Sequence, residues 1–358
     1  GPLRPRRLVA HGSPRGLEAK GVASWKDGKL VDEITDGEEA GIILDKTPFY
    51  AEGGGQVGDE GLLLGEFGRI KATNAKKLPD GTVYHVSYVE EGQLKVGETV
   101  KIEVDQEKKL ASARNHTATH LLQAALKKVV GDQVNQAGSS VTPDRLRFDF
   151  TNFEPVTAQQ LADVEALVNK VILKGQDVEI SHMSLDEAKK AGAMALFSEK
   201  YGDVVRVVRV PGFSMELCAG SHVKNVGQIG MFKIVGETGI ASGVRRIEAI
   251  TGKAALDYAN EKLATLQKAA ALLKANEDDV PAAVEKLQAE GKEMAGKLAE
   301  VAAMQEKADA QQLIAGVKDI KGVSVITGKA NVENMDSLRD VADLTLDKLG
   351  SGVVVLGC

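Results

Sequence analysis

The N-terminal part of the chain alternates apolar and polar residues in short stretches. Between residues 20 and 105 such stretches, for example 82–86 and 100–104, are rich in β-branched side chains. Alternation with a period of two is typical of strands that bury one face. Pairs of an acidic residue and a glycine mark tight turns in the same region, at Asp27-Gly28, Asp80-Gly81 and Glu91-Gly92. The pattern predicts a small β-barrel or sandwich over residues 20–105.

A helical period replaces this alternation near residue 106. Apolar residues between Leu110 and Val130 fall on one side of a helix that Gly131 ends: Leu121, Leu122, Ala125, Leu126 and Val129. A second helix is predicted over residues 158–174.

Shorter elements follow. A third helix is predicted to begin at Ser184, because Ser184 and Glu187 have the spacing of a capping box. The valine-rich segment 204–210 is a strand by composition and is followed by Pro211-Gly212. Mixed strands and helices predict an α+β core over residues 106–253.

Residues 254–312 are rich in Ala, Lys, Glu and Leu and carry an apolar residue every seven positions, at Val280, Leu287, Met294 and Val301. This spacing is typical of a coiled-coil seam. A break is predicted before Pro281, since proline suits a first helical turn, so we expect a helical hairpin rather than one rod. The arm is either an exposed spacer or a device that positions the next domain or a second subunit.

The C-terminal segment, residues 313–358, reads strand, helix, strand. Residues 323–327 are apolar and β-branched, residues 338–349 have a helical pattern, and residues 353–356 form a strand expected to be buried. Such a unit has little core of its own, and we expect a truncated α/β domain. The complete prediction is an α+β protein with a barrel, a mixed core, a helical arm and this partial domain.

Composition limits the protein classes and cellular locations that fit this chain. The chain has 358 residues, 43% of them hydrophobic, and no apolar run approaches the length of a membrane-spanning helix. Its two cysteines are compatible with a reducing cytosol, so a cytoplasmic location is expected. A net charge of -6 excludes nucleic-acid binding through bulk charge but leaves room for a local basic patch. Residues 1–19 are basic and aperiodic; they are either a disordered extension or tag, or a basic RNA-binding arm.

Two pairs of metal-binding residue types share one spacing: His116 with His120, and Cys218 with His222. Residues four apart on a helix lie on one face, so the two histidines can hold one ion together. Three imidazoles and a thiolate suit tetrahedral zinc. The alternative is two unrelated pairs, core histidines and a buried thiol. A zinc site would in turn be structural with four protein ligands, or catalytic if one position opens to water.

A run of three glycines before Gln56, residues 53–55, has no use inside a strand or helix. It is either a mobile turn or a loop whose N–H groups approach a ligand, with Gln56 offering both a donor and an acceptor. No phosphate-loop Lys-Ser or Lys-Thr follows, which argues against a nucleoside triphosphate site. Farther along, Arg245 and Arg246 either bind RNA phosphate or a terminal ribose, or form surface ion pairs with acidic neighbours, Glu237 and Glu248.

These motifs together resemble one family. Residues 114–122 resemble the first metal motif of alanyl-tRNA synthetase editing domains and of the free-standing AlaX proteins, and residues 216–223 resemble the second. Ala219 and Ser221 stand where the family more often has Gly and Thr. Further segments match in the family's order: 53–56, 147–150, 193–201 and 239–252. Threonyl-tRNA synthetase editing domains share the metal motifs, but the glycine loop, the arginine pair and the C-terminal tail favour the alanyl branch.

The resemblance implies hydrolytic editing of Ser-tRNA(Ala) and Gly-tRNA(Ala), with the acceptor end of the tRNA in a cleft between the barrel and the α+β core. It implies zinc held by His116, His120, Cys218 and His222. Gln56 and the N–H groups of Gly54 and Gly55 are expected to hold the ester carbonyl or the polar groups of the amino acid. Glu52 and Gln56 are hypotheses for the ligand of the serine hydroxyl, and Arg245 and Arg246 for RNA binding. No water-activating group is evident.

The tail from residue 254 resembles the C-Ala domain, which is a helical arm followed by a DHH-associated globular domain, and a homodimer through this tail is possible. The family's glycine-rich stretch does not follow Cys358, which leaves tRNA-elbow binding outside the expectation. Nothing resembles the class II aminoacylation core, so we expect neither alanine activation nor ATP use. The competing classes are a non-catalytic zinc-containing module for tRNA binding and dimerisation, and a zinc-dependent amidase of a small metabolite.

Overall fold

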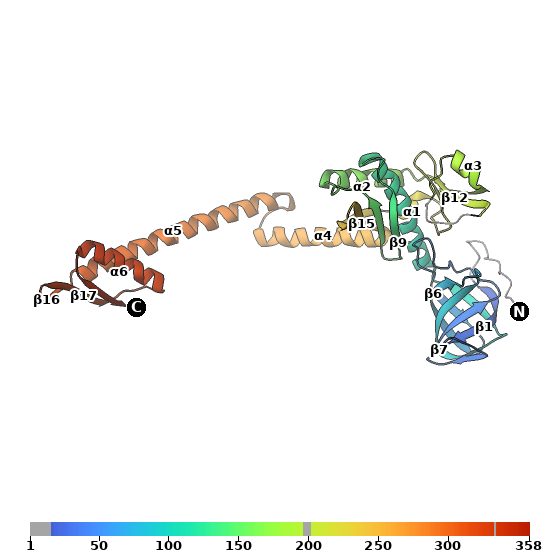
Figure 1. The fold of residues 1–358 in the computed structure, drawn as a ribbon, viewed down its shortest axis with the longest axis horizontal. Helices are drawn as coiled ribbons and strands as arrows, with labels where there is room; N and C mark the ends of the chain where they lie inside the picture. Colours follow the sequence, from blue (N-terminus) through green and yellow to red (C-terminus); the bar gives the residue numbers. More distant parts are fainter. Residues whose placement is uncertain (1–15, 196–201, 333) are drawn as a thin grey trace. The chain divides into compact units, whose positions relative to one another are not determined.

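The computed structural model describes residues 16–195, 202–332 and 334–358. The chain divides into two compact units, Gly1–Glu261 and Lys262–Cys358 (Figure 1). Residues 1–15, most of the predicted N-terminal extension, lie outside the described residues, as do residues 196–201 of the segment 193–201. No described helix combines the length and the apolar character needed to cross a membrane.

The predicted β-barrel is present and closed. Six antiparallel strands form a ring, since β1 pairs with β4 on one side and with β8 on the other. In ring order they are β1 (Leu17–Lys26), β4 (Glu39–Leu44), β7 (Val83–Lys95), β6 (Gly68–Lys77), β5 (Gly61–Leu64) and β8 (Thr99–Val104). Two short strands, β2 (Lys29–Val31) and β3 (Glu33–Thr35), pair with β1 and β7. Because β1 begins at Leu17, residues 17–19 belong to the barrel and not to a disordered extension.

Alternating side chains fill the barrel with aliphatic residues, including the fully buried Ile42, Leu63, Ile70 and Val100. Helix α1 (Gln106–Val129) leaves the barrel directly after β8, with the side chain of Asp105 capping its N-terminus. It therefore starts four residues before the apolar periodicity, at the cap rather than at the first buried side chain.

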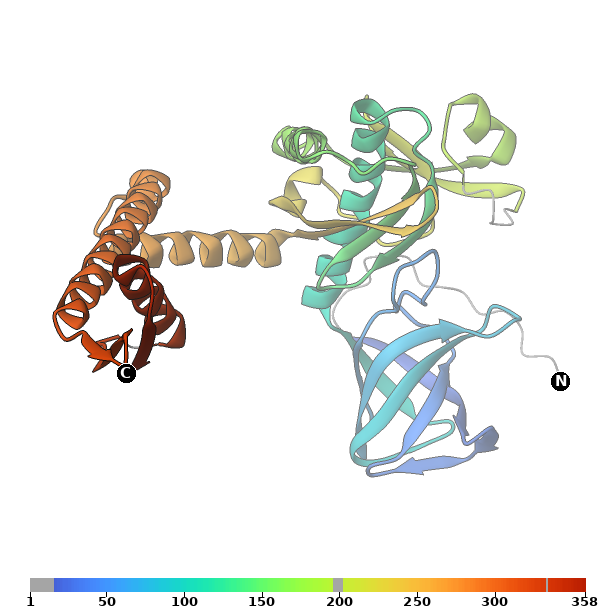
Figure 2. The same cartoon turned by 60° about the vertical axis from the view of Figure 1, so that its left-hand side comes forward.

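The α+β core contains a four-stranded antiparallel sheet that packs against α1 and α2 (Ala158–Leu173). Its order is β14 (Phe232–Ala241), β15 (Val244–Thr251), β10 (Leu146–Thr151) and β9 (Gln136–Val141). Figure 2 shows α1 running along this sheet. The shared core includes Leu121 and Leu126 of α1, Phe148 of β10, Val168 of α2 and Ile247 of β15. The mixed core predicted from the sequence is thus confirmed.

A second, three-stranded sheet leads directly into the Cys218 and His222 pair. It consists of β11 (Glu179–Ser184), β12 (Val204–Val210) and β13 (Ser214–Leu217). Helix α3 (Leu185–Lys190) begins with the predicted capping box, in which Ser184 and Glu187 each bind the other's backbone N–H. A short 3-10 helix, η1 (Val226–Ile229), leads back to the first sheet.

The helical arm contains α4 (Gly252–Leu273), the 3-10 turn η2 (Glu277–Asp279) and α5 (Val280–Ile314). The predicted break is confirmed, with Pro281 in the first turn of α5. Seam residues of α5 stay exposed: Leu287 by 58%, Met294 by 65% and Val301 by 63%. Pairing of this seam with another helix remains a prediction.

The C-terminal sheet confirms the strand–helix–strand pattern. Strands β17 (Val323–Lys329) and β18 (Val353–Gly357) are parallel and joined by α6 (Met335–Leu349), and an edge strand that was not anticipated, β16 (Lys318–Ile320), is antiparallel to β17. The expectation that residues 353–356 are buried is wrong, because Val353 and Val355 are 49% and 57% exposed. Only the face that carries Leu356 packs on α5 and α6, so the alternate side chains point away from the core.

Candidate metal centre

The two predicted pairs meet in space. One ligand atom from each of His116, His120, Cys218 and His222 lies within 4.8 Å of the others. The Sγ atom of Cys218 is 3.4 Å from Nε2 of His116 and 3.3 Å from Nε2 of His222. Tetrahedral zinc with bonds of about 2.3 Å to sulfur and about 2.0 Å to nitrogen needs sulfur–nitrogen separations of roughly 3.5 Å. The donor set and these two sulfur–nitrogen separations therefore fit a zinc ion.

Local sequence explains how the second pair reaches the first. Cys218 comes directly after β13, and the turn to His222 passes over the imidazole of His116. A Cβ atom at Gly220 would lie 2.0 Å from Cε1 of His116, so only glycine permits this approach. The guanidinium of Arg206, on β12, donates to the carbonyl oxygens of Cys218 and Gly220 at 2.8 and 2.9 Å. The sequence did not indicate Arg206, whose two hydrogen bonds hold the turn between Cys218 and His222 in place.

Neighbouring side chains fix the orientation of two imidazoles. Oε1 of Gln56 accepts the backbone N–H of Ser221 at 2.9 Å, which identifies that atom as the oxygen of the amide. The same oxygen is 2.6 Å from Nδ1 of His116, so Nδ1 carries the proton and Nε2 presents its lone pair to the cluster. Thr117, also missed from sequence, contacts Nδ1 of His222 at 3.0 Å. Such partners set ligand tautomer and direction.

Burial keeps His116 and His120 neutral and able to bind a metal ion. Burial, with a smaller effect from the positive charge of Arg206, lowers the pKa of His116 to about 4. Burial likewise places the pKa of His120 well below its ordinary value, and His116 and Arg206 act in the same direction. Neutral imidazole is the form that ligates.

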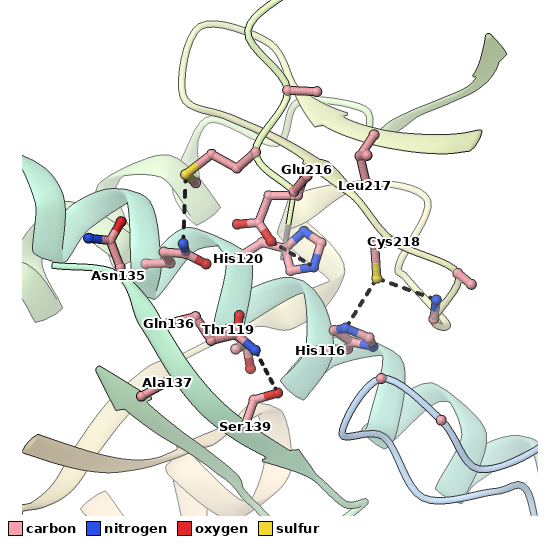
Figure 3. A pocket seen from close by; sticks show the side chains of 18 of the residues that line it. His116, Thr119, His120, Asn135, Gln136, Ala137, Ser139, Glu216, Leu217 and Cys218 are labelled. Carbon is pink, nitrogen blue, oxygen red and sulfur yellow. Dashed lines mark hydrogen bonds and ion pairs between the residues drawn. The ribbon is translucent and has the colours of Figure 1, made fainter. Parts of the chain in front are cut away.

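The cluster lies on the wall of a cavity of about 850 Å³, a size typical of small-molecule sites. Its lining includes Tyr50, Ala51, Gly53 and Gly54 of a barrel loop, and residues of α1 and of the strands around it (Figure 3). A buried ion pair joins the barrel to α1 beside this loop, with Nζ of Lys109 2.6 Å from the carboxylate of Asp59. The expected cleft between the barrel and the α+β core is therefore present.

A buried acid on the same wall, Glu216, belongs to the second metal motif, residues 216–223. The sequence alone did not indicate a role for it. Glu216, on β13, has Oε2 3.4 Å from Nε2 of His120, and its Oε1 has no hydrogen-bond partner in the described part of the chain. Burial raises the pKa of Glu216 to about 8, with Lys127 opposing the shift. Its carboxyl group and the imidazole of His120 lie side by side in Figure 3.

Comparisons with known proteins agree with these motifs. A family described as threonyl and alanyl tRNA synthetase second additional domain matches residues 205–248, which contain Cys218 and His222. Alanine–tRNA ligases of Geobacillus kaustophilus and Acetivibrio thermocellus are 49% and 47% identical over 94% and 93% of the chain. Over almost its whole length the chain is therefore similar to a segment of these ligases. It spans 38% of the length of either relative.

A second family, described as tRNA synthetases class II (A), matches residues 13–108. This match falls largely on the barrel. It leaves the expectation that nothing in the chain resembles the class II aminoacylation core as a prediction.

The glycine loop, residues 53–55, is held in place. Its backbone pairs with β9, with Val141 donating to Gly55 and accepting from Val57 at 2.7 and 3.0 Å. Gly54 lines the cavity, whereas Gln56 is only 1% exposed and lies behind His116. Gly55 has a φ of +80°, and a Cβ there would lie 2.5 Å from Oγ of Ser139. Order of this kind favours a ligand-facing loop over a mobile turn.

Three other residues proposed for substrate contact lie away from the cavity lining. Glu52 accepts a hydrogen bond from Nδ2 of Asn74 at 2.7 Å. Arg245 forms two hydrogen bonds to Glu237, at 2.6 and 2.8 Å, and Arg246 forms two to Asp149, at 2.7 and 2.9 Å. The structure thus supports the ion-pair interpretation of Arg245, and pairs Arg246 with an acid that the sequence did not single out.

Proposed function

We propose that this chain hydrolyses the ester that joins serine or glycine to the 3' end of tRNA(Ala). The observation that carries the proposal is a zinc-type ligand cluster on the wall of a preformed cavity, next to an ordered glycine loop. A purely structural zinc site needs neither the cavity nor the loop. The relatives' names connect the chain to tRNA(Ala), whose acceptor end is the substrate in this proposal.

Zinc is the ion that the donor set fits best, held by His116, His120, Cys218 and His222. When bound, zinc supplies Lewis-acid polarisation of an oxygen. The protein's own contribution is orientation. Gln56 and Thr117 fix two of the imidazoles, and Arg206 holds the ligand turn. The buried position of the cluster keeps bulk water from competing for the histidine nitrogens.

The glycine loop is assigned to the amino acid and its ester. Gly53 and Gly54 line the cavity, so the ester can approach their backbone closely. Gln56 acts through His116, since its oxygen is already engaged by His116 and Ser221. Selection of serine over alanine follows if the cavity's polar groups pair with the serine hydroxyl, because alanine leaves them unpaired.

The proposal also includes a cytoplasmic location, a DHH-associated-like C-terminal domain and homodimer formation through the C-terminal tail.

The test is release of the amino acid from Ser-tRNA(Ala), Gly-tRNA(Ala) and Ala-tRNA(Ala). We expect the full chain to deacylate the first two and to spare the third. His116→Ala should lower the rate at least 100-fold, because it removes a ligand and exposes the cluster. His182→Ala is the matched control, since His182 is exposed on β11 and should leave the rate unchanged.

Two results would contradict editing. If the zinc-loaded chain binds tRNA but releases nothing, it is a non-catalytic tRNA-binding module. Hydrolysis of small amides without any tRNA requirement would instead identify a metabolite amidase.

A further inference from the structure

One buried polar atom on the cavity wall has no partner. Among the described residues, six side chains have a buried nitrogen or oxygen without a hydrogen bond: Gln56, Thr82, Arg147, Ser214, Glu216 and Ser221. Of these, only Glu216 lines the cavity. A buried carboxyl oxygen without a partner is costly, and a donor on a ligand in the cavity would satisfy Oε1.

Within the described part of the chain, no group donates a hydrogen bond to Oε1. The other oxygen, Oε2, faces His120 at 3.4 Å. Two further polar side chains on the same wall are engaged elsewhere: Thr119 donates to the backbone oxygen of Asn115 at 2.8 Å, and the amide of Gln123 contacts Sδ of Met194 at 3.7 Å. A ligand that satisfies Glu216 must therefore carry its own N–H or O–H group.

Charge is distributed unevenly around the cavity. Glu216 is its one acidic lining residue among those described, and it is only 8% exposed. Three lysines line the same cavity: Lys77 on β6 and Lys189 on α3 are exposed, and Lys127 on α1 is half-buried. None of the three has a carboxylate within ion-pair distance among the described residues. The acid thus lies deep and the cations lie toward solvent.

We propose that Oε1 of Glu216 receives the ammonium group of an aminoacyl ester, while the lysines face the phosphates of its nucleotide end. This inference rests on the proposed editing function and deepens it, because it assigns an amino-group ligand that the motifs did not. An aminoacylated RNA end carries an ammonium group on the amino acid and phosphates along the nucleotides, which matches a deep acid and outer lysines. A free amino acid has no phosphates for the lysines, and a peptidyl or formylated ester has no ammonium for Glu216.

The experiment compares seryl and N-acetylseryl groups. Binding is measured with 3'-seryl-amido-3'-deoxyadenosine and its N-acetyl form, which do not require hydrolysis, and deacylation is measured with the two esters on tRNA(Ala). The zinc-loaded full chain should prefer the free amine by about 10- to 100-fold, the range expected for one hydrogen bond to a charged group. Glu216→Gln keeps the shape and should reduce this preference to less than about threefold. Glu216→Asp should restore part of it.

A purely structural role predicts something different. If Glu216 only orients His120, the Gln variant loses zinc affinity or rate for both forms alike, and the ratio between them does not move. An unchanged ratio overturns the inference, whatever the absolute rates are. If the wild-type chain prefers the amine in binding but hydrolyses neither ester, the editing function fails while the assignment of Glu216 survives.

Discussion

The interior of the barrel and the wall of the cavity each bury histidine, with opposite consequences. His85 in the barrel and His116 at the cavity are both buried, and burial lowers the pKa of each to about 4. In the barrel both ring nitrogens have partners: Nε2 is 2.8 Å from Oγ1 of Thr47 and Nδ1 is 2.9 Å from the carbonyl oxygen of Ile42. At the cavity only Nδ1 is engaged outside the cluster, and Nε2 faces Cys218. Burial and a lowered pKa therefore do not distinguish a structural histidine from a ligand; the direction of the second nitrogen does.

The largest expected effect in this comparison comes from removing the hydrogen-bond partner of His116 at the cavity. Gln56→Ala removes the oxygen that fixes the proton on Nδ1 of His116. We expect a loss of 10- to 100-fold in zinc affinity and in deacylation, the usual range for a group that orients a metal ligand. Zinc affinity is measured by competition with a chelating dye, and Gln159→Ala on the exposed face of α2 is the matched control. A variant that binds zinc normally but deacylates poorly would instead support the original assignment of Gln56 to the substrate.

The next effect concerns the barrel and appears as a dependence of stability on pH. The folded pKa of His85, about 4, lies below the ordinary value of 6.5, so the unfolded chain takes up a proton first. The stabilising contribution is fully present above pH 6.5 and is lost as the pH falls toward 4. At pH 5 the loss is about 2 kcal/mol.

The single tryptophan of the chain, Trp25, lies in β1 and reports barrel unfolding by fluorescence. Denaturant unfolding of zinc-saturated protein at pH 7.5 and pH 5 should show a pH-dependent loss that is about 2 kcal/mol smaller in His85→Gln. His182→Gln, at an exposed site, should behave as wild type. Equal losses in all three proteins would mean that His85 is not the group that titrates.

Sequence reasoning succeeded where a pattern is local or where a motif is long. Period-two and helical periodicity located the barrel and α1. The spacing of His116, His120, Cys218 and His222 predicted the metal cluster, although its two pairs lie about a hundred positions apart in the sequence. It did not identify Arg206, Thr117 or the role of Glu216. These side chains matter through contacts between distant segments, and nothing local distinguishes Arg206 from Arg209, the other arginine of the same valine-rich strand. Burial of β18 was misjudged for the same reason, because composition does not show which face of a sheet a helix will cover.

The smallest expected effect separates lysines at the cavity from lysines on the barrel surface. Lys189 lines the cavity and has no carboxylate partner among the described residues, whereas Lys101 on β8 is 2.9 Å from the carboxylate of Glu103. Lys189→Ala should raise the KM for Ser-tRNA(Ala) about two- to fivefold and leave kcat nearly unchanged, because phosphate contacts bind ground and transition states alike. It should also reduce the slope of log KM against log salt by about 0.7, the value for one contact to a single strand. Lys101→Ala should change neither quantity. If both variants raise KM equally, the RNA binds through the general surface charge of the protein. Lys189 then makes no specific contact with the phosphates.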